Sequence, residues 1–242
     1  MLTHGSLFSG IGGIDKGFER AGIKTVWQCE IDDKASELLA LRFPGVPNYR
    51  DVREVKNDGT IAIPDIISGG FPCQDVSLNG ERLGLDGKRS TLWSEFARII
   101  CEFRPKWVVA ENVRGLLSAN DGEFFGNILR DLANIRYDAE WTIIPTGYFC
   151  GLPHQRERVF IIAYPAGERW NEARVFNGGT QKHSWFSREH SCTNDKEIWR
   201  LSEADVCREI DGFPDWVDRL KQCGNAVVPP MAEWIGRRLV QK

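Results

Sequence analysis

Near its N-terminus the chain reads Gly5-Ser6-Leu7-Phe8-Ser9-Gly10-Ile11-Gly12-Gly13. Residues 5–8 are predicted to form a strand, the glycines a tight turn, and the residues through about 21 a helix. Such a turn lets the backbone approach a nucleotide-like ligand closely. The glycines lack the GxGxxG spacing of dinucleotide binders, however, and no Walker lysine follows them. A plain strand-to-helix connection is the alternative interpretation.

Downstream of this turn, short apolar runs alternate with amphipathic stretches as far as residue 164. We expect strands at residues 25–29, 65–68, 107–110, 140–144 and 158–163, and helices at residues 32–42, 91–103 and 124–134. In the helix at 91–103, the apolar side chains on one face are Leu92, Phe96, Ile99, Ile100 and Phe103. This alternation is typical of a parallel sheet covered on both faces, and therefore predicts an α/β fold.

The character of the chain changes after residue 164. The following residues, up to about 200, are polar and loop-like, whereas an apolar-periodic helix at 228–239 begins with Pro229-Pro230. We therefore predict three regions: a catalytic domain at 1–164, a small irregular region at 165–221, and a segment at 222–242 that returns to the catalytic domain.

Composition and charge narrow the class of protein. The 242 residues are 42% hydrophobic and 27% charged, without the ~18 consecutive apolar residues of a membrane span. The N-terminus lacks the features of a signal peptide, so we expect a cytoplasmic protein without a membrane partner. A net charge of -3 means that nucleic-acid binding would need a localised basic face. Its candidate residues are Arg82, Lys88, Arg89, Arg114, Arg156, Arg158, Arg200 and Arg208.

The cysteines are seven in number, and none falls in a C-x-x-C arrangement. This argues against a disulfide framework and a zinc ribbon. We interpret Cys29, Cys101 and Cys207 as buried packing residues. No metal is expected either, because His183, His190 and Cys192 have no known ligand spacing.

One cysteine has a different setting. Cys73 lies in Gly69-Gly70-Phe71-Pro72-Cys73-Gln74, just after a predicted strand, where open α/β sheets place their active sites. Glu111 follows another strand and is expected at the same edge of the sheet. Glu30 ends the second strand, where a carboxylate can accept both hydroxyl protons of a ribose.

These residues belong to a series of five motifs that follow one another along the chain. The motifs are the glycine turn, Phe71-Pro72-Cys73-Gln74, Glu111-Asn112-Val113, Gln155-Arg156-Glu157-Arg158 and Gly224-Asn225-Ala226-Val227. This series resembles that of the DNA cytosine-5 methyltransferases, and residues 205–229 are most similar to the compact bacterial and phage branch. The resemblance implies a Rossmann-like, S-adenosylmethionine-dependent methyltransferase fold with a small DNA-recognition region. The implied reaction is methyl transfer to C5 of a cytosine flipped out of duplex DNA.

The resemblance also implies four catalytic residues. Cys73 would attack C6 of the cytosine and make C5 nucleophilic. Glu111 would contact N3 and the exocyclic amine, Arg158 would reach O2 of the base, and Arg156 would support Arg158. The base must leave the duplex stack for any of these contacts to form.

For the cofactor, the resemblance places Phe8 on the adenine, Gly10 and Ile11 at the methionine end, Glu30 on the ribose and Asp51 at the adenine amine. The full set of expected S-adenosylmethionine contacts is Phe8, Ser9, Gly10, Ile11, Glu30, Ile31, Asp51, Val52, Asn225 and Val227.

The chain departs from the family pattern at two places. His154 stands where the family usually has Gln, and residues 165–200 are short for a target-recognition segment. This brevity predicts a short or degenerate target of about two to four base pairs, or reliance on a partner for further selectivity. The expected partner is double-stranded DNA, bound by a monomer in a prokaryotic or phage-infected cell, with a cognate restriction endonuclease as a further possible partner. Two alternatives stay open: an RNA cytosine-5 methyltransferase, whose usual signature has proline at the position of Phe71, and an inactive nucleic-acid-binding homologue.

Overall fold

The fold is described from a computed structural model of the 242-residue chain. The structure describes residues 1–72, 92–146, 149, 157–167, 175–176 and 226–242. Cys73, Arg156, Asn225 and the greater part of the 165–221 region lie outside the described residues. The division into three regions therefore stays a prediction.

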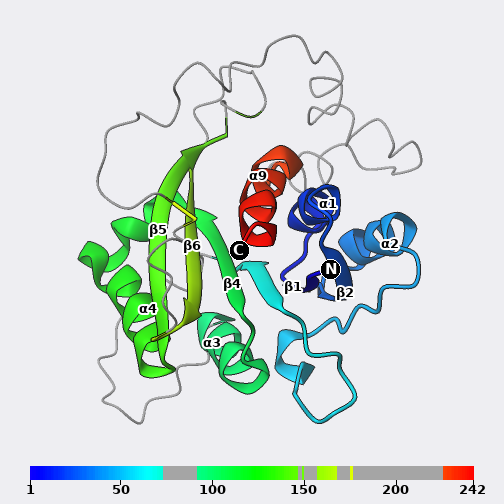
Figure 1. The fold of residues 1–242 in the computed structure, drawn as a ribbon, viewed down its shortest axis with the longest axis horizontal. Coiled ribbons are helices and arrows are strands. Elements are labelled where there is room, and N and C mark those ends of the chain that lie inside the picture. The colour runs from blue at the N-terminus through cyan, green and yellow to red at the C-terminus, as the bar shows by residue number, and fades with distance from the viewer. Residues whose placement is uncertain (73–91, 147–148, 150–156, 168–174, 177–225) are drawn as a thin grey trace.

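A six-stranded sheet forms the centre of the molecule, in the order β2-β1-β3-β4-β6-β5 (Figure 1). The strands are β1 Thr3–Leu7, β2 Lys24–Cys29, β3 Ile66–Gly70, β4 Trp107–Val113, β5 Tyr137–Pro145 and β6 Glu157–Pro165. The first four pair in parallel, so their carboxyl ends meet at one edge of the sheet.

The prediction of a parallel sheet is wrong for one strand. β6 runs antiparallel to both of its neighbours, β4 and β5. Only residues 146–156 separate β5 from β6, fewer than the dozen or more that a parallel crossover needs. Pairing with β6 also carries β4 through Glu111 and Asn112 to Val113, beyond the strand end expected at residue 110.

Helices cover both faces of this sheet. α1 is Gly13–Arg20, α2 Asp33–Arg42, α3 Leu92–Phe103, α4 Glu123–Asn134 and α9 Pro229–Val240, and short 3-10 turns lie at Val52–Glu54, Arg114–Leu117 and Ala119–Gly122. Alternation along β4 shows the two layers: Val108 packs in the cluster with α3 and α4, whereas Val109 packs in the cluster with α1 and α9. The α/β layering expected from the sequence is confirmed.

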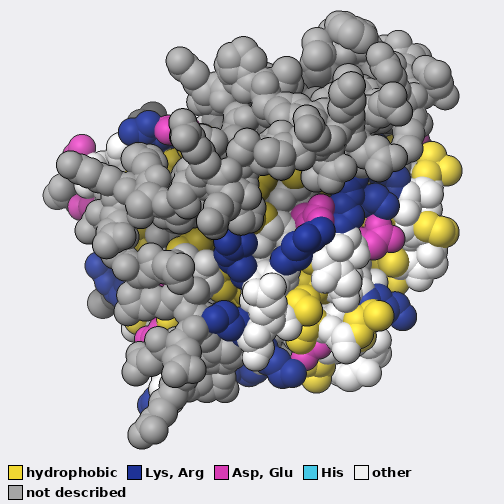
Figure 2. Space-filling model, turned by 45° about the horizontal axis from the view of Figure 1, so that its top comes forward, with side chains coloured by type: hydrophobic (Ala, Val, Ile, Leu, Met, Phe, Trp, Pro, Cys, Tyr) yellow, Lys and Arg dark blue, Asp and Glu magenta, His cyan; other side chains and the backbone are white. Residues whose placement is uncertain are grey.

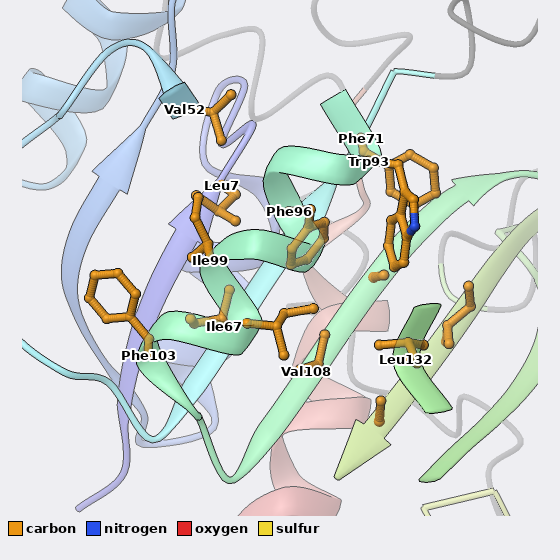
Figure 3. Packing of buried hydrophobic residues seen from close by; sticks show 14 of the residues in the cluster. Leu7, Val52, Ile67, Phe71, Trp93, Phe96, Ile99, Phe103, Val108 and Leu132 are labelled. Atoms are coloured by element: carbon orange, nitrogen blue, oxygen red, sulfur yellow. The ribbon is translucent and has the colours of Figure 1, made fainter. Parts of the chain in front are cut away.

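The apolar stripe of α3 fills the first cluster. Phe96, Ile99, Ile100 and Phe103 are buried as expected, while Leu92 is half-buried. Figure 3 shows Phe96 beside Trp93 and Phe71, and the Phe71 and Trp93 ring centroids are 5.1 Å apart. Burying each such aromatic ring stabilises the fold by about 1.5–3 kcal/mol.

The prediction that Cys101 is buried was wrong. Cys101 is an exposed free thiol on α3, because position 101 lies off the stripe formed by its buried neighbours. Cys29 is buried as predicted, and its thiol donates to the Arg50 carbonyl oxygen at 3.3 Å. Burial raises the pKa of Cys29 to about 12, so this thiol stays protonated and is unsuited to nucleophilic attack.

The C-terminal helix α9 packs beside α1 through small residues (Figure 1). A Cβ atom built on Gly17 would lie 2.4 Å from the Pro229 carbonyl oxygen, and one on Gly236 would lie 2.8 Å from the Ala21 Cβ. Two glycines thus let the helix axes approach. One consequence is that the residues just before α9 reach the glycine turn at the N-terminus.

Two residues of the predicted 165–221 region pack onto the sheet beside α9. Val175 and Phe176 are buried, and both backbone N–H groups donate to the Glu140 carboxylate of β5, at 2.7 and 3.2 Å. The Phe176 ring stacks on Trp234 of α9. This short segment is therefore fixed to the core that α9 shares with the central sheet.

Candidate active site

A cavity of about 650 Å³ lies at the carboxyl ends of β1, β2 and β3. Its size is in the range of small-molecule and cofactor sites. The lining includes nine of the ten expected cofactor contacts, all except Asn225, which lies outside the described residues: Phe8, Ser9, Gly10, Ile11, Glu30, Ile31, Asp51, Val52 and Val227. The fold therefore brings these nine residues, which were predicted from the sequence, to one cavity.

The glycine turn forms one wall of the cavity. Gly10 and Gly12 have φ values of 53° and 82°, in the left-handed region that glycine adopts most readily. The turn is closed by the Gly12 N–H, which donates to the Ser9 carbonyl oxygen at 2.9 Å. A Cβ atom on Gly13 would lie 2.1 Å from the backbone oxygen of Val227, so only glycine lets the C-terminal segment close this wall.

Glu30 joins two walls of the cavity. Its Oε2 accepts the Gly10 N–H at 2.7 Å, and its Oε1 accepts the Asp32 N–H at 2.9 Å. Its backbone N–H donates to the Asn48 side chain. A carboxylate oxygen can accept more than one hydrogen bond, so both oxygens can still receive hydroxyl protons from a ligand.

Asp51 has local partners as well as a place at the cavity. Its carboxylate accepts the Arg53 backbone N–H at 3.0 Å and the Arg53 guanidinium, which lies 2.6 Å away. These bonds hold the pKa of Asp51 below its ordinary value, so the group is a carboxylate at neutral pH. A charged acceptor is thus held at the rim beside Val52.

Glu111 of β4 lines the cavity, and Arg158 of the antiparallel β6 lies against it. Arg158 Nε lies 2.7 Å from Glu111 Oε1, although the two atoms do not have the alignment of a hydrogen bond. Both side chains are largely buried, 11% and 8% exposed. A buried carboxylate needs such a counter-charge, because isolating it from water would cost several kcal/mol.

Gly70 gives the Glu111 carboxylate its space. A Cβ atom at position 70 would lie 2.7 Å from Glu111 Oε2, closer than side chains approach one another. Both residues line the cavity. The end of β3 is therefore shaped around a carboxylate that β4 supplies.

The chain that leads to Cys73 is anchored just before that residue. The Asn112 side-chain amide donates to the Phe71 carbonyl oxygen at 2.8 Å, and the Phe71 ring is buried against Trp93 and Phe96. The next residue, Pro72, lines the cavity. Cys73 itself lies outside the described residues, but its immediate neighbour in the chain borders the same space as Glu111.

A buried carboxyl group lies behind the glycine turn. Asp15 of α1 accepts hydrogen bonds from the Ser6 hydroxyl at 3.0 Å and from the Gln28 amide at 2.9 Å. Burial raises the pKa of Asp15 to about 6. These bonds tie the strands β1 and β2 to α1 behind the cavity.

The charged side chains that line the cavity are five carboxylates and three basic groups. This balance favours a ligand that carries positive charge over a phosphate. Among the described residues, no group of three or more His, Cys, Asp or Glu side chains is arranged to hold a metal ion. None of the described helices is long and apolar enough to cross a membrane.

On the face shown in Figure 2, the described basic side chains do not gather into a single patch. Figure 2 shows Lys and Arg side chains spread among acidic and uncharged ones on the described part of this face. Of the basic residues expected to face DNA, Arg158 is largely buried against Glu111, and exposed Arg114 pairs with Glu157. The other six lie outside the described residues.

Comparison with known families identifies the family to which the chain belongs. A family model described as C-5 cytosine-specific DNA methylase matches residues 2–212. The chain belongs to this family. Membership confirms the resemblance drawn from the ordered motifs.

Curated members of the family are similar over a large part of this chain. The type II methyltransferase M.NgoFVII of Neisseria gonorrhoeae is 41% identical over 65% of this chain and 42% of its own length. M.BsuFI of Bacillus subtilis is 32% identical over 90% of this chain and 53% of its own length. The chain thus spans about half the length of these relatives.

Solved structures of two methyltransferases show the same fold. An E. coli prophage-encoded protein described as a DNA modification methyltransferase has a TM-score of 0.69 at 19% identity, with 100% of this chain and 99% of that chain covered. The Dnmt2 methyltransferase of S. pombe has a TM-score of 0.56 at 22% identity, with 76% and 57% covered. The expected Rossmann-like methyltransferase fold is confirmed.

Three residues that shape the site were not assigned a role from the sequence. Asn112 was quoted only as part of a motif, yet it holds the Phe71 backbone. Gly70 leaves space for the Glu111 carboxylate, and the Arg50 guanidinium donates to the backbone carbonyl of Ile31 in the cavity wall. An asparagine directly after the glutamate expected in the active site is a usable signal, whereas nothing about Arg50 in the sequence distinguishes it from a solvated charge.

Proposed function

We propose that the chain is a DNA (cytosine-5-)-methyltransferase that uses S-adenosylmethionine as its methyl donor. The observation that carries this proposal is that one cavity is lined by the glycine turn and Glu30 and also by Pro72 and Glu111. The expected cofactor contacts therefore border the same space as the expected catalytic carboxylate and the residue before the expected nucleophile. Methyl transfer requires this proximity, because donor and acceptor carbon must lie in near-attack geometry.

The residues of the cavity fit the cofactor. Glu30 is placed to accept ribose hydroxyls, the half-buried Phe8 and the exposed Ile31 offer apolar surface to an adenine, and Asp51 offers a charged acceptor for its amine. The excess of carboxylates suits a sulfonium cation. Asn225 and Val227 would close the pocket from the C-terminal side. When bound, the cofactor supplies an electrophilic methyl group.

Cys73 is the proposed nucleophile. Its thiolate adds to C6 of cytosine, and the C5–C6 π electrons make C5 nucleophilic toward the methyl group. C5 would take the methyl group as that group's bond to the sulfonium sulfur breaks, which would leave S-adenosylhomocysteine. Loss of the C5 proton to water would then re-form the C5–C6 double bond as the bond between C6 and the Cys73 sulfur breaks, which frees Cys73 and leaves 5-methylcytosine. Burial of Cys29 and its raised pKa leave that nearby thiol unsuited to this role.

Glu111 and Arg158 are proposed to hold the flipped base. The Glu111 carboxyl group would contact N3 and the exocyclic amine of cytosine and stabilise charge that develops in the ring. Arg158, already 2.7 Å from Glu111, would reach O2 of the base, with support from Arg156. Asn112 would act indirectly, because its bond to the Phe71 carbonyl fixes the backbone two residues before Cys73.

Double-stranded DNA is the proposed substrate, from which the target base must be extruded at a cost of a few kcal/mol. Similarity to bacterial type II methyltransferases supports DNA rather than RNA as the substrate. It also supports the cytoplasm of a prokaryotic or phage-infected cell as the setting, where a cognate restriction endonuclease is a proposed partner. We propose that the chain acts as a monomer.

A methyl-transfer assay tests this proposal directly. Purified protein is incubated with tritiated S-adenosylmethionine and, in parallel, duplex DNA, single-stranded DNA or tRNA, with Cys73→Ser as the control. Label transferred to cytosine C5 of duplex DNA by the wild type alone supports the proposal. Label in tRNA only would favour the RNA enzyme, and no transfer to any substrate would favour an inactive homologue.

A further inference from the structure

Arg50 has a backbone conformation that its side chain does not favour. Its φ is 63°, in the left-handed region where an L-residue brings Cβ close to the following carbonyl oxygen. The Arg50 N–H donates to Asn48 Oδ1 at 3.0 Å, and its carbonyl oxygen accepts from the Cys29 thiol. Residues held in such a conformation persist where surrounding contacts outweigh the cost, and they cluster at ligand sites.

The Arg50 side chain provides such contacts by crossing the connection between β2 and α2. Its Nη2 donates to the Ile31 carbonyl oxygen at 2.7 Å, and its Nη1 lies 3.4 Å from the Asp32 carbonyl oxygen. The same guanidinium also donates to the Ser36 hydroxyl and pairs with the Asp33 carboxylate. A planar guanidinium can serve several acceptors at fixed angles, which a lysine ammonium does not match.

The connection that Arg50 ties down is a wall of the cavity. Ile31 lines the cavity, and the residue is 62% exposed. An apolar side chain held open to solvent at a cavity rim is suited to cover an apolar part of a ligand. Glu30, just before it, is held by the same group of residues, since Asn48 bonds to the Glu30 backbone N–H and to the Ser36 hydroxyl.

We propose that Arg50 is a positioning residue that fixes the wall facing the nucleoside part of the cofactor, an inference that rests on the proposed use of S-adenosylmethionine. Arg50 holds the Ile31 carbonyl in place, and thereby sets where the Ile31 side chain and the Glu30 carboxylate meet the adenosine. Without the guanidinium, the connection between β2 and α2 gains freedom that ligand binding must remove. Affinity falls while the chemical step is unchanged.

Arg50→Gly and Arg50→Ala separate this role from a purely structural one. Both remove the guanidinium, but glycine adopts the φ of 63° without strain, whereas alanine keeps the strain of an L-residue. We expect Arg50→Gly to melt at a higher temperature than Arg50→Ala without ligand. Both variants are expected to bind S-adenosylmethionine and S-adenosylhomocysteine about tenfold more weakly in calorimetry. A structural role alone would instead make affinity follow the melting temperature.

Kinetics and two further variants complete the test. Arg50→Gly should raise the KM for S-adenosylmethionine, with kcat and the KM for DNA within about twofold of wild type. Arg50→Lys should stay weakened, because one ammonium cannot replace the guanidinium at several acceptors. Arg130→Ala, which removes an exposed arginine of α4, is the control and should bind like wild type.

Each result has a defined meaning. Weak binding by the Gly, Ala and Lys variants, with normal binding by the control, supports the inference. Wild-type affinity in Arg50→Gly or Arg50→Lys would overturn it while leaving the proposed function intact. If the wild-type protein itself bound no S-adenosylmethionine, the proposed function would fail and this inference with it.

Discussion

Gly70 ends β3 next to the Glu111 carboxylate, and replacing it with alanine tests how closely that carboxylate must be placed. The new Cβ atom would lie 2.7 Å from Glu111 Oε2, whereas ordinary contact begins at 3.4 Å, so the carboxylate must shift by about 0.7 Å. The clash is with the end of a side chain and not with backbone, and the φ of Gly70 is not in the left-handed region. We therefore expect Gly70→Ala to fold with the stability of wild type.

The expected effect is on the reaction rate. A displacement of about 1 Å in a reacting group can cost about a hundredfold in rate. For about 0.7 Å we expect a thirtyfold to hundredfold fall in the rate of methyl transfer, equivalent to about 2–3 kcal/mol of transition-state stabilisation. Single-turnover transfer of tritiated methyl groups to duplex DNA measures this rate, and calorimetry measures cofactor affinity separately.

Two controls make this result interpretable. Gly126→Ala places a Cβ atom in open space on α4 and should leave the rate unchanged. Glu111→Gln keeps the shape of the side chain but removes its charge, and should lose at least as much rate as Gly70→Ala. Transfer by Gly70→Ala at the wild-type rate would refute the reasoning, as would a loss explained entirely by weaker cofactor binding.

Three further predictions concern the cofactor, the buried carboxyl group and the anchored segment. Glu30→Ala should weaken S-adenosylmethionine binding about tenfold to a hundredfold in calorimetry, because a hydrogen bond to a charged group is worth about 1.5–3 kcal/mol. Unchanged affinity would mean that Glu30 only links the backbones of Gly10 and Asp32. The pKa of Asp15, raised to about 6, means that the folded state binds its proton more tightly than the unfolded state. The protonated Asp15 carboxyl group therefore stabilises the fold fully below pH ~4, and this stabilisation is lost as pH rises through ~6. Between pH 4.5 and 7.5, the free energy of unfolding of wild type, measured with urea, should fall by about 2 kcal/mol relative to that of Asp15→Asn. Glu140→Ala removes the acceptor of the Val175 and Phe176 N–H groups and should cost about 1–3 kcal/mol by the same method, with Glu140→Gln intermediate because it keeps one acceptor oxygen.

Local patterns predicted most of the fold. The apolar stripe of α3 and the glycine turn before α1 depend on neighbours three or four residues away, which a sequence displays directly. The reversed direction of β6 was missed because apolar runs of a strand look the same in either orientation. Cys101 was misplaced because the general tendency of cysteine to be buried was given more weight than its position off the helical stripe.

The candidate site was predictable as a set of residues but not as a set of contacts. Glu111 and Arg158 were both identified, yet their ion pair depends on the antiparallel register that pairs Val113 with Arg158. The role of Gly70 depends on a side chain that arrives from the next strand. The left-handed conformation of Arg50 leaves no periodic signal, so only the structure connects it with the cavity.

The central claim is that Cys73 forms a covalent bond to C6 of the target cytosine, and a trapping experiment tests it most directly. Duplex DNA that contains 5-fluorocytosine is incubated with the protein and S-adenosylmethionine. The C5 fluorine replaces the hydrogen that is normally lost as a proton, so the step that releases Cys73 is blocked. The account predicts a denaturation-resistant complex that needs the cofactor and is absent in Cys73→Ser, with the DNA adduct on the Cys73 peptide in mass spectrometry. An active protein that forms no such complex, or one whose adduct lies on another cysteine, would contradict it.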